Sequence, residues 1–382
     1  MGTNLILLSA LALGAAIGTS GSPGPSAAAA LDETARFLAG KGAGADSKLA
    51  AYARGGFYAE YSEQIKTGFA RFQQPNLVEM QTWWRKYSPA TSPAVFYPFS
   101  GPDIAHAIAL FPDADTYLLF GLEPPGAIPN PRAMHPDTIR AGLNGVLTSL
   151  DTIFEASFFV TKGMERKLGR TSFNGIAGLL MLFLAMSNCT VTGARKIAVG
   201  PDSTLVAGTA ADEAILWQSP PLSRVPGVEI TFTRERGKPQ TVRYFMLNVE
   251  DASLAKSSPN FLPYVKSMGR VATVIKSASY LMHKDSAREP PPCFDQIRAL
   301  VLAQSDFIVQ DDSGVPLKHF ARDRWKLLFH GYYDEPIPMF SNLLQKDLKL
   351  EMQKGSTGRL PFSYGYNRKR GESNLMTAER IQ

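Results

Sequence analysis

Residues 94–126 read AVFYPFSGPDIAHAIALFPDADTYLLFGLEPPG and carry the clearest signal of fold class in the chain. The apolar run 94–99 predicts a strand, and the turn 100–103 leads into a short helix over 104–110. Pro112 ends that helix, and the apolar run 116–120 predicts a second strand. A strand, a loop, a helix and a strand within about thirty residues form the crossover unit of a parallel sheet.

The same order of elements returns near the C-terminus. A strand is predicted over 270–276, a serine-containing loop over 277–283, a helix over 294–303 and a strand over 306–310, which ends in the acidic loop 311–314. Any parallel sheet repeats such units, so the likeness indicates a shared architecture and does not require a duplication.

The remaining pattern surrounds these two units with helices. Helical spacing is found over 31–87, 136–167, 176–186, 261–268 and 339–353, and a further strand is predicted over 190–199. Alternating apolar residues over 228–249, with Gly237 in the turn, predict an antiparallel hairpin. The expected fold is a mixed, mostly parallel, Rossmann-like α/β sheet flanked by helices, with that hairpin as an insertion. We expect a helical segment over 31–90, the α/β domain over 91–366 and a tail over 367–382.

The first thirty residues predict export. They contain no charged side chain, and an apolar run over 5–17 is followed by small residues that end in four alanines at 27–30. This is the pattern of a signal peptide and places the protein in the periplasm or cell envelope. Because no Lys or Arg precedes the apolar run, an uncleaved anchor is the alternative. No later window is long enough to span a bilayer. In an oxidising compartment Cys189 and Cys293 could form a disulfide, which the sequence alone does not decide.

The charge pattern argues against a nucleic-acid-binding protein. The formal net charge is +6, but the Lys and Arg residues are scattered along the chain. No basic helix interleaved with aromatic residues is present in the sequence. A small polar or anionic molecule is the expected partner instead, and no motif identifies a cofactor.

Ligands of parallel sheets bind outside the carboxyl ends of the strands, where four polar loops are predicted. The turn 100–103 precedes a helix, whose free N–H groups suit an anion, although Ser100 or Asp103 could instead cap that helix. The candidate ligand-binding residues in the four loops are Ser100, Gly101, Asp103, Glu123, Lys276, Ser279, Asp311 and Asp312.

Three further interpretations follow from single features. Asp311 and Asp312 could coordinate a divalent cation or form a tight turn; no histidines share helical metal-ligand spacing, so no metal site is predicted. His283 and His319 lie near the candidate loops and are the best candidates for acid–base catalysis, which makes a hydrolase the first alternative. Trp83 and Trp84 would form the contact face of an envelope structural or assembly protein, the second alternative, although core packing is expected for at least one of them.

Two resemblances add to this interpretation. Residues 94–123 resemble the first unit of methyltransferase-type Rossmann domains, with 100–103 as the small-residue loop and Glu123 as the acidic residue that ends the second strand. Only Gly101 remains of the usual glycine-rich loop, so the resemblance implies the strand–loop–helix–strand arrangement and not the activity. The segments YPFSGPD (97–103), QDDSGVP (310–316) and LPFSYGY (360–366) resemble a family of uncharacterised exported bacterial proteins. That resemblance implies export and a single fold from about residue 70 onward.

Overall fold

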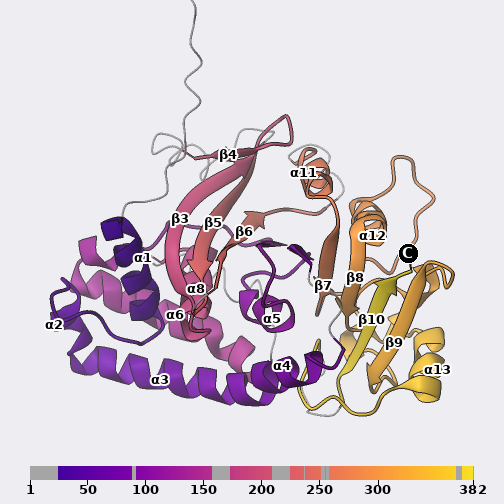
Figure 1. The fold of residues 1–382 in the computed structure, drawn as a ribbon, viewed down its shortest axis with the longest axis horizontal. Coiled ribbons are helices and arrows are strands. Elements are labelled where there is room, and N and C mark those ends of the chain that lie inside the picture. Colours follow the sequence, from indigo (N-terminus) through magenta and orange to yellow (C-terminus); the bar gives the residue numbers. More distant parts are fainter. Residues whose placement is uncertain are drawn as a thin grey trace, which may run out of the picture.

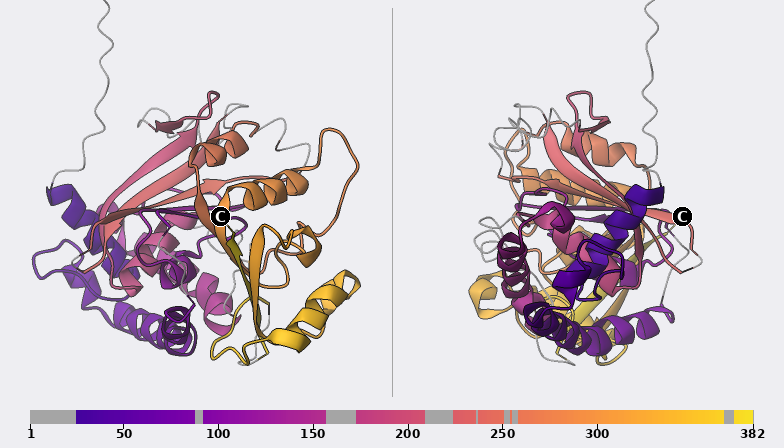
Figure 2. Two further views of the ribbon diagram at one scale, coloured as in Figure 1. Left: turned by 45° about the vertical axis from the view of Figure 1, so that its right-hand side comes forward. Right: turned by 90° about the vertical axis from the view of Figure 1, so that its left-hand side faces the viewer.

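The computed structural model describes residues 25–87, 92–156, 173–208, 224–235, 237–250, 254, 258–366 and 372–381. Its strands form one twisted sheet of ten, in the order β4-β3-β5-β6-β2-β1-β7-β8-β10-β9 (Figure 1). Helices cover both faces of this sheet (Figure 2). The expectation of a mixed α/β sheet flanked by helices is therefore confirmed.

The centre of the sheet is parallel. It consists of β6 (Pro239–Met246), β2 (Thr116–Gly121), β1 (Ala94–Tyr97), β7 (Val271–Ile275) and β8 (Ser305–Gln310). Helix α5 (Ile104–Leu110) connects β1 to β2, and α12 (Cys293–Gln304) connects β7 to β8. Both predicted crossover units are thus present, side by side.

The two ends of the sheet are antiparallel. Beyond β6 lie β5 (Val225–Thr233), β3 (Thr190–Val199) and β4 (Leu205–Ala207). Of the nine strand pairs only four are parallel, so the expectation of a mostly parallel sheet is wrong. The predicted hairpin is β5–β6, but it is not an insertion, because β6 is also the parallel neighbour of β2. Alternation of apolar residues identifies a hairpin but does not say which strand it will pair with next.

The C-terminal residues continue the sheet. Strand β10 (Asn374–Arg380) lies between β8 and β9 (Trp325–Gly331), antiparallel to both. The prediction of a tail over 367–382 is therefore wrong for 374–380, while 367–371 lie outside the described residues. The apolar stretch 375–378 is too short and too mixed to indicate a strand by itself, and its pairing depends on two partners distant in sequence.

Side chains of successive strand residues separate the core into two layers. In β1, Val95 and Tyr97 face one layer, whereas Ala94 and Phe96 face the other. The first layer is covered by α5 and by α1 (Pro25–Leu38), α3 (Gly56–Phe72), α4 (Glu79–Trp84), α6 (Pro136–Ala156) and α8 (Ile176–Met186). The second is covered by α12, α11 (Phe261–Ser267) and α13 (Lys346–Gly355). Shorter elements are α2 (Ala50–Ala53), η1 (Gln73–Val78), η2 (Pro131–Ala133), η3 (Leu317–His319) and η4 (Pro338–Leu343).

The tryptophans of α4 pack inward. Trp84 is buried, and its ring lies against Phe111 and Phe307. Trp83 is half-buried and packs edge-on against His330 and Phe362. The expectation that at least one of the pair belongs to the core is confirmed, and Trp84 is not available to a partner surface.

The structure bears on only part of the predictions for the N-terminal segment and for the two cysteines. Helix α1 begins at Pro25, so residues 25–30 form its first turns, and 1–24 lie outside the described residues. Within the described ranges, no helix combines the length and the apolar character needed to cross a membrane. Cys189 and Cys293 are both free and buried, and they belong to opposite core layers, so they form no disulfide.

Candidate functional site

The two crossover units lie on opposite sides of the boundary between the neighbouring strands β1 and β7. From β1 the chain moves through α5 to β2 on one side, and from β7 it moves through α12 to β8 on the other. The two helices cover opposite layers. In open α/β sheets such a reversal of strand order is a topological switch point, and the loops that leave it at the carboxyl ends of the strands border a crevice.

A buried ionic cluster joins the two loops at this point. Nζ of Lys276, at the end of β7, lies 2.6 Å from Oδ2 of Asp103, in the loop after β1. The Tyr97 hydroxyl donates to the same oxygen (2.9 Å), and Nδ1 of His106 lies 2.7 Å from Oδ1. Asp103 also accepts a hydrogen bond from the backbone N–H of His106 and so caps α5. The capping alternative is therefore confirmed for Asp103.

Burial determines the charges of this cluster. Asp103, His106 and Lys276 are each at most 3% exposed. Burial opposes ionisation of Asp103, but the contacts with His106 and Lys276 outweigh it and hold the pKa of Asp103 well below its usual range. Burial lowers the pKa values of His106 and Lys276, and Asp103 opposes both shifts. The cluster therefore contains an ionised carboxylate that its own neighbours already satisfy.

The acidic loop after β8 supports the loop after β7. Oδ2 of Asp311 accepts the backbone N–H of Ser277 (3.0 Å), and Oδ1 accepts both the N–H and the hydroxyl of Ser313. The Ser313 hydroxyl oxygen in turn accepts the N–H of Ala278 (2.7 Å). Burial and the neighbouring Asp312 raise the pKa of Asp311 to about 7, although these hydrogen bonds oppose the shift. Asp311 is thus a buried carboxyl that holds a neighbouring backbone in place.

Asp312 has a separate set of partners. Its carboxylate accepts hydrogen bonds from the Tyr280 hydroxyl and from Nδ2 of Asn374 (2.9 Å), a residue of β10. Burial raises the pKa of Asp312, and these two bonds oppose the shift. The tight-turn alternative for this loop is therefore supported by its contacts.

The loop after β7 has an unusual backbone. Ser277, Ser279 and Tyr280 all have positive φ, between 52° and 53°. Non-glycine residues rarely adopt this region, and such conformations persist only where the surroundings impose them. Asp311 restrains Ser277, and the Tyr366 hydroxyl accepts the N–H of Ser279 (3.1 Å) while donating to the carbonyl of Ser277 (2.9 Å). Gly365 has to be glycine, because a Cβ there would lie 2.0 Å from Oδ2 of Asp311.

The loops after β1 and β2 meet on the other side of β1. The N–H of Gly101 donates to the carbonyl of Phe120, and Gly101 has a φ of 55°. The Glu123 carboxylate lies beside Gly101 and accepts a hydrogen bond from the Tyr244 hydroxyl (3.2 Å). Ser100 is buried, and its hydroxyl bonds the backbone of its own loop.

The candidate residues are therefore brought together, but most are buried. Of the eight, only Ser279 is exposed. Within the four loops the exposed residues are Ser279 and Leu122, which is 54% exposed, and we call these two residues the rim; Phe99 and Ser277 are half-buried. The hydroxyl oxygen of Ser277 is buried and has no hydrogen-bond partner among the described residues.

The two candidate catalytic histidines lie beside this site and not within the ionic cluster. His283 packs edge-on against Tyr280, and burial lowers its pKa to about 4 despite hydrogen bonds to the backbone of Asp312 and Gly314. Nε2 of His319 lies 3.2 Å from Oδ1 of Asp285, and burial lowers its pKa as well. Nε2 of His283 is buried, so a substrate does not reach it in this arrangement.

Several residues of the site were not among the sequence candidates. They are Tyr97, His106, Ser313 and Tyr366. The spacing of three residues between Asp103 and His106 places both on one helical face and so predicts that they lie close together. It does not predict that both contact Lys276. Tyr366 belongs to a segment of irregular sequence, and no local sequence pattern predicts its contact with the loop after β7. Among the described residues, no three or more His, Cys, Asp or Glu side chains gather as metal ligands.

Comparison of the chain with protein-family models, with curated proteins and with solved structures finds no match. The site is therefore interpreted from its own geometry.

Proposed function

We propose that the loops at the carboxyl ends of β1 and β7 border a crevice and that this protein binds a small polar molecule there. The observation that carries the proposal is the 2.6 Å contact between Asp103 and Lys276, which brings the two loops together where the strand order reverses. On this interpretation the five parallel strands act as a Rossmann-like core, and the buried residues position the rim residues that touch the ligand.

The charges at the crevice favour a donor-rich ligand over an anion. Four carboxyl groups, those of Asp103, Glu123, Asp311 and Asp312, accompany one amine, that of Lys276. Asp103 also occupies the N-terminus of α5, where an anion would otherwise find free N–H groups. A neutral or cationic molecule offering N–H or O–H donors suits this environment better than a phosphate or a carboxylate.

The strained backbone conformation of the loop after β7 also supports a binding site at this place. Strained conformations cluster where a ligand is held, and here Ser277, Ser279 and Tyr280 share one. A ligand donor at this rim would also supply a partner for the buried Ser277 hydroxyl.

The test is a binding measurement by saturation-transfer NMR. The probes are L-lysine, ethanolamine and spermidine as donors, with inorganic phosphate and citrate as anions. Leu122→Trp fills the rim, and Leu328→Trp, at a half-exposed leucine of β9, is the matched control. We expect saturation of a donor probe that is lost in Leu122→Trp and kept in Leu328→Trp. Binding of the anions alone, or no dependence on Leu122, contradicts the proposal.

The hydrolase alternative is distinguished by turnover. Purified protein is given ester, phosphoester and glycoside substrates, and His283→Ala is compared with the parent. Because Nε2 of His283 is buried, we expect no hydrolysis that depends on this residue. Hydrolysis that His283→Ala removes would favour the enzyme over the binding protein.

Export to the periplasm or cell envelope is part of the proposal, and it rests on the uncharged apolar segment at the start of the chain. The test is fractionation of cells that express the full chain, with N-terminal sequencing of the product. A product retained in the cytoplasm with its first residues intact contradicts it.

A further inference from the structure

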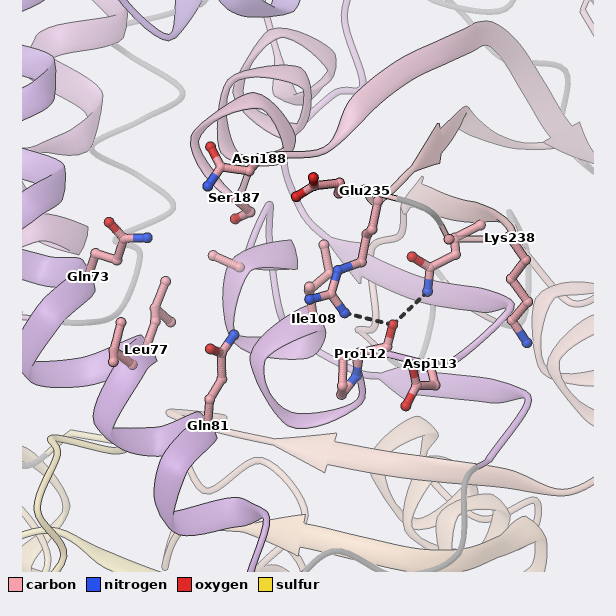
Figure 3. Close-up of a pocket in the computed structure, with 15 residues that line it drawn as sticks. Gln73, Leu77, Gln81, Ile108, Pro112, Asp113, Ser187, Asn188, Glu235 and Lys238 are labelled. Carbon is pink, nitrogen blue, oxygen red and sulfur yellow. Dashed lines mark hydrogen bonds between the residues drawn. The ribbon is translucent and has the colours of Figure 1, made fainter.

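A second site lies at the opposite ends of the same strands. A cavity of about 610 Å³ opens at the amino ends of β2 and β6. Its walls come from η1 and α4, from α5 and the loop after it, from the end of α8, and from the β5–β6 turn (Figure 3). Cavities of this size hold small molecules. None of the residues proposed for the crevice lines it.

The deepest polar group of this cavity is the amide of Gln240, which is 2% exposed. Its Nε2 donates to the carbonyls of Pro112 (2.9 Å) and Ala114 (2.6 Å) and lies 3.3 Å from the Tyr117 hydroxyl. Carbonyl oxygens only accept, so the NH₂ of Gln240 has to face them and its Oε1 has to point away. That oxygen is buried and has no hydrogen-bond partner among the described residues. The hydrogen bonds of Nε2 fix the amide at the amino end of β6.

The uncharged polar groups of the wall are amides and a hydroxyl group. Figure 3 shows the side chains of Gln73, Gln81 and Ser187 directed toward the same space from three elements. An amide offers both donors and an acceptor, and a hydroxyl group does the same. Walls of this kind match a ligand that also carries many hydroxyl groups.

Among the described residues of the wall, the charged groups balance. Arg234 and Lys238 carry two positive charges, and Asp113 and Glu235 carry two negative charges. Arg234 also donates to the carbonyl of Pro112 (3.1 Å), and Lys238 pairs with Asp115. With no net charge among these four groups, a neutral ligand is favoured over an ion.

The apolar part of the wall is aliphatic. Leu77, Ala105 and Ile108 contribute to it, and none of the lining residues that the structure describes is aromatic. A peptide bound by strand addition would need an exposed sheet edge, but β5 and β6 are both interior strands. From these contacts we infer that the cavity binds a neutral polyhydroxylated molecule of mono- or disaccharide size, which the amides of Gln73 and Gln81 and the hydroxyl of Ser187 hold by hydrogen bonds.

The experiment is a titration of the full chain followed by saturation-transfer NMR and calorimetry. The probes are glucose, maltose and trehalose, with L-glutamate, L-lysine and trialanine as comparison molecules. We expect at least one sugar to bind, and Gln73→Leu/Gln81→Leu to weaken it by about tenfold or more, because two polar partners are removed. Gln353→Leu, at an exposed glutamine of α13, is the matched control and should bind as the parent does.

A second variant keeps the test independent of folding. Ser187→Trp, at the end of α8, fills the cavity without removing a hydrogen bond of Gln240 and should also abolish sugar binding. Leu122→Trp, which fills the crevice at the other end of the strands, should leave it unchanged. Failure of all three sugars to bind overturns the inference, as does sugar binding that both cavity variants retain. Binding of only a charged probe or trialanine, lost in the variants, also overturns it.

Discussion

The polar groups at the two ends of the parallel strands differ in whether the protein itself satisfies their hydrogen bonds. At the carboxyl ends, Asp103, Lys276 and Asp311 are buried and bonded to groups of the protein itself. At the amino ends, the amides of Gln73 and Gln81 line an open cavity, and Oε1 of Gln240 has no partner among the described residues. The first arrangement fixes loop positions, whereas the second leaves hydrogen-bonding capacity for a ligand. Polar residues at a strand end are therefore evidence of a binding site only after their existing partners are counted.

The largest expected effect is on stability at the carboxyl ends. Asp103→Ala leaves Lys276 buried without its carboxylate and removes the cap of α5. Breaking a buried pair in this way costs about 3–5 kcal/mol in the free energy of unfolding. Urea denaturation followed by circular dichroism measures it.

The matched control is Asp306→Ala, which removes the exposed ion pair with Arg270. Exposed pairs contribute less than about 1 kcal/mol. Equal losses in the two variants would show that the Asp103 cluster does not hold the loops together.

The next effect is a pH dependence at the same end. The folded pKa of Asp311 is about 7, against 3.8 for an ordinary aspartate, so between these values the folded state keeps a proton that the unfolded chain has released. Its contribution to stability is complete below pH 3.8 and declines as the pH rises to about 7. Asp311→Asn should reduce this decline, while the raised pKa of Asp312 maintains part of it. Urea midpoints measured across that pH range test it, and an unchanged slope in the variant would contradict it.

The smallest expected effect is at the amino ends. Gln81 is half-buried at the cavity wall, so Gln81→Leu should change the free energy of unfolding by no more than about 0.5 kcal/mol. Thermal denaturation of the variant and its parent measures the difference. A large loss of stability would mean that the amides of the cavity hold the fold, as the groups at the other end do, and the contrast between the two ends would disappear.

Prediction from sequence was most successful where the signal is local. The units 94–126 and 271–314 were recognised because each places a short apolar strand, a loop and a helix within one stretch of chain. Asp103 was recognised as a possible cap for the same reason. Strand β10 was missed, because its pairing with β8 and β9 joins segments that lie far apart in the sequence. The cavity was missed as well, since its walls come from four separate segments and Gln240 resembles any other strand residue in the sequence.

Local sequence patterns predict the two crossover units and the polar residues that end the parallel strands, because each depends on neighbours a few residues away. Contacts between distant segments establish that those polar residues satisfy one another, that β6 joins the hairpin to the parallel strands, and that an amide oxygen at the other end has no partner among the described residues. The reason is physical: burial and hydrogen-bond partnership are properties of groups brought together in space, and a linear pattern does not contain them.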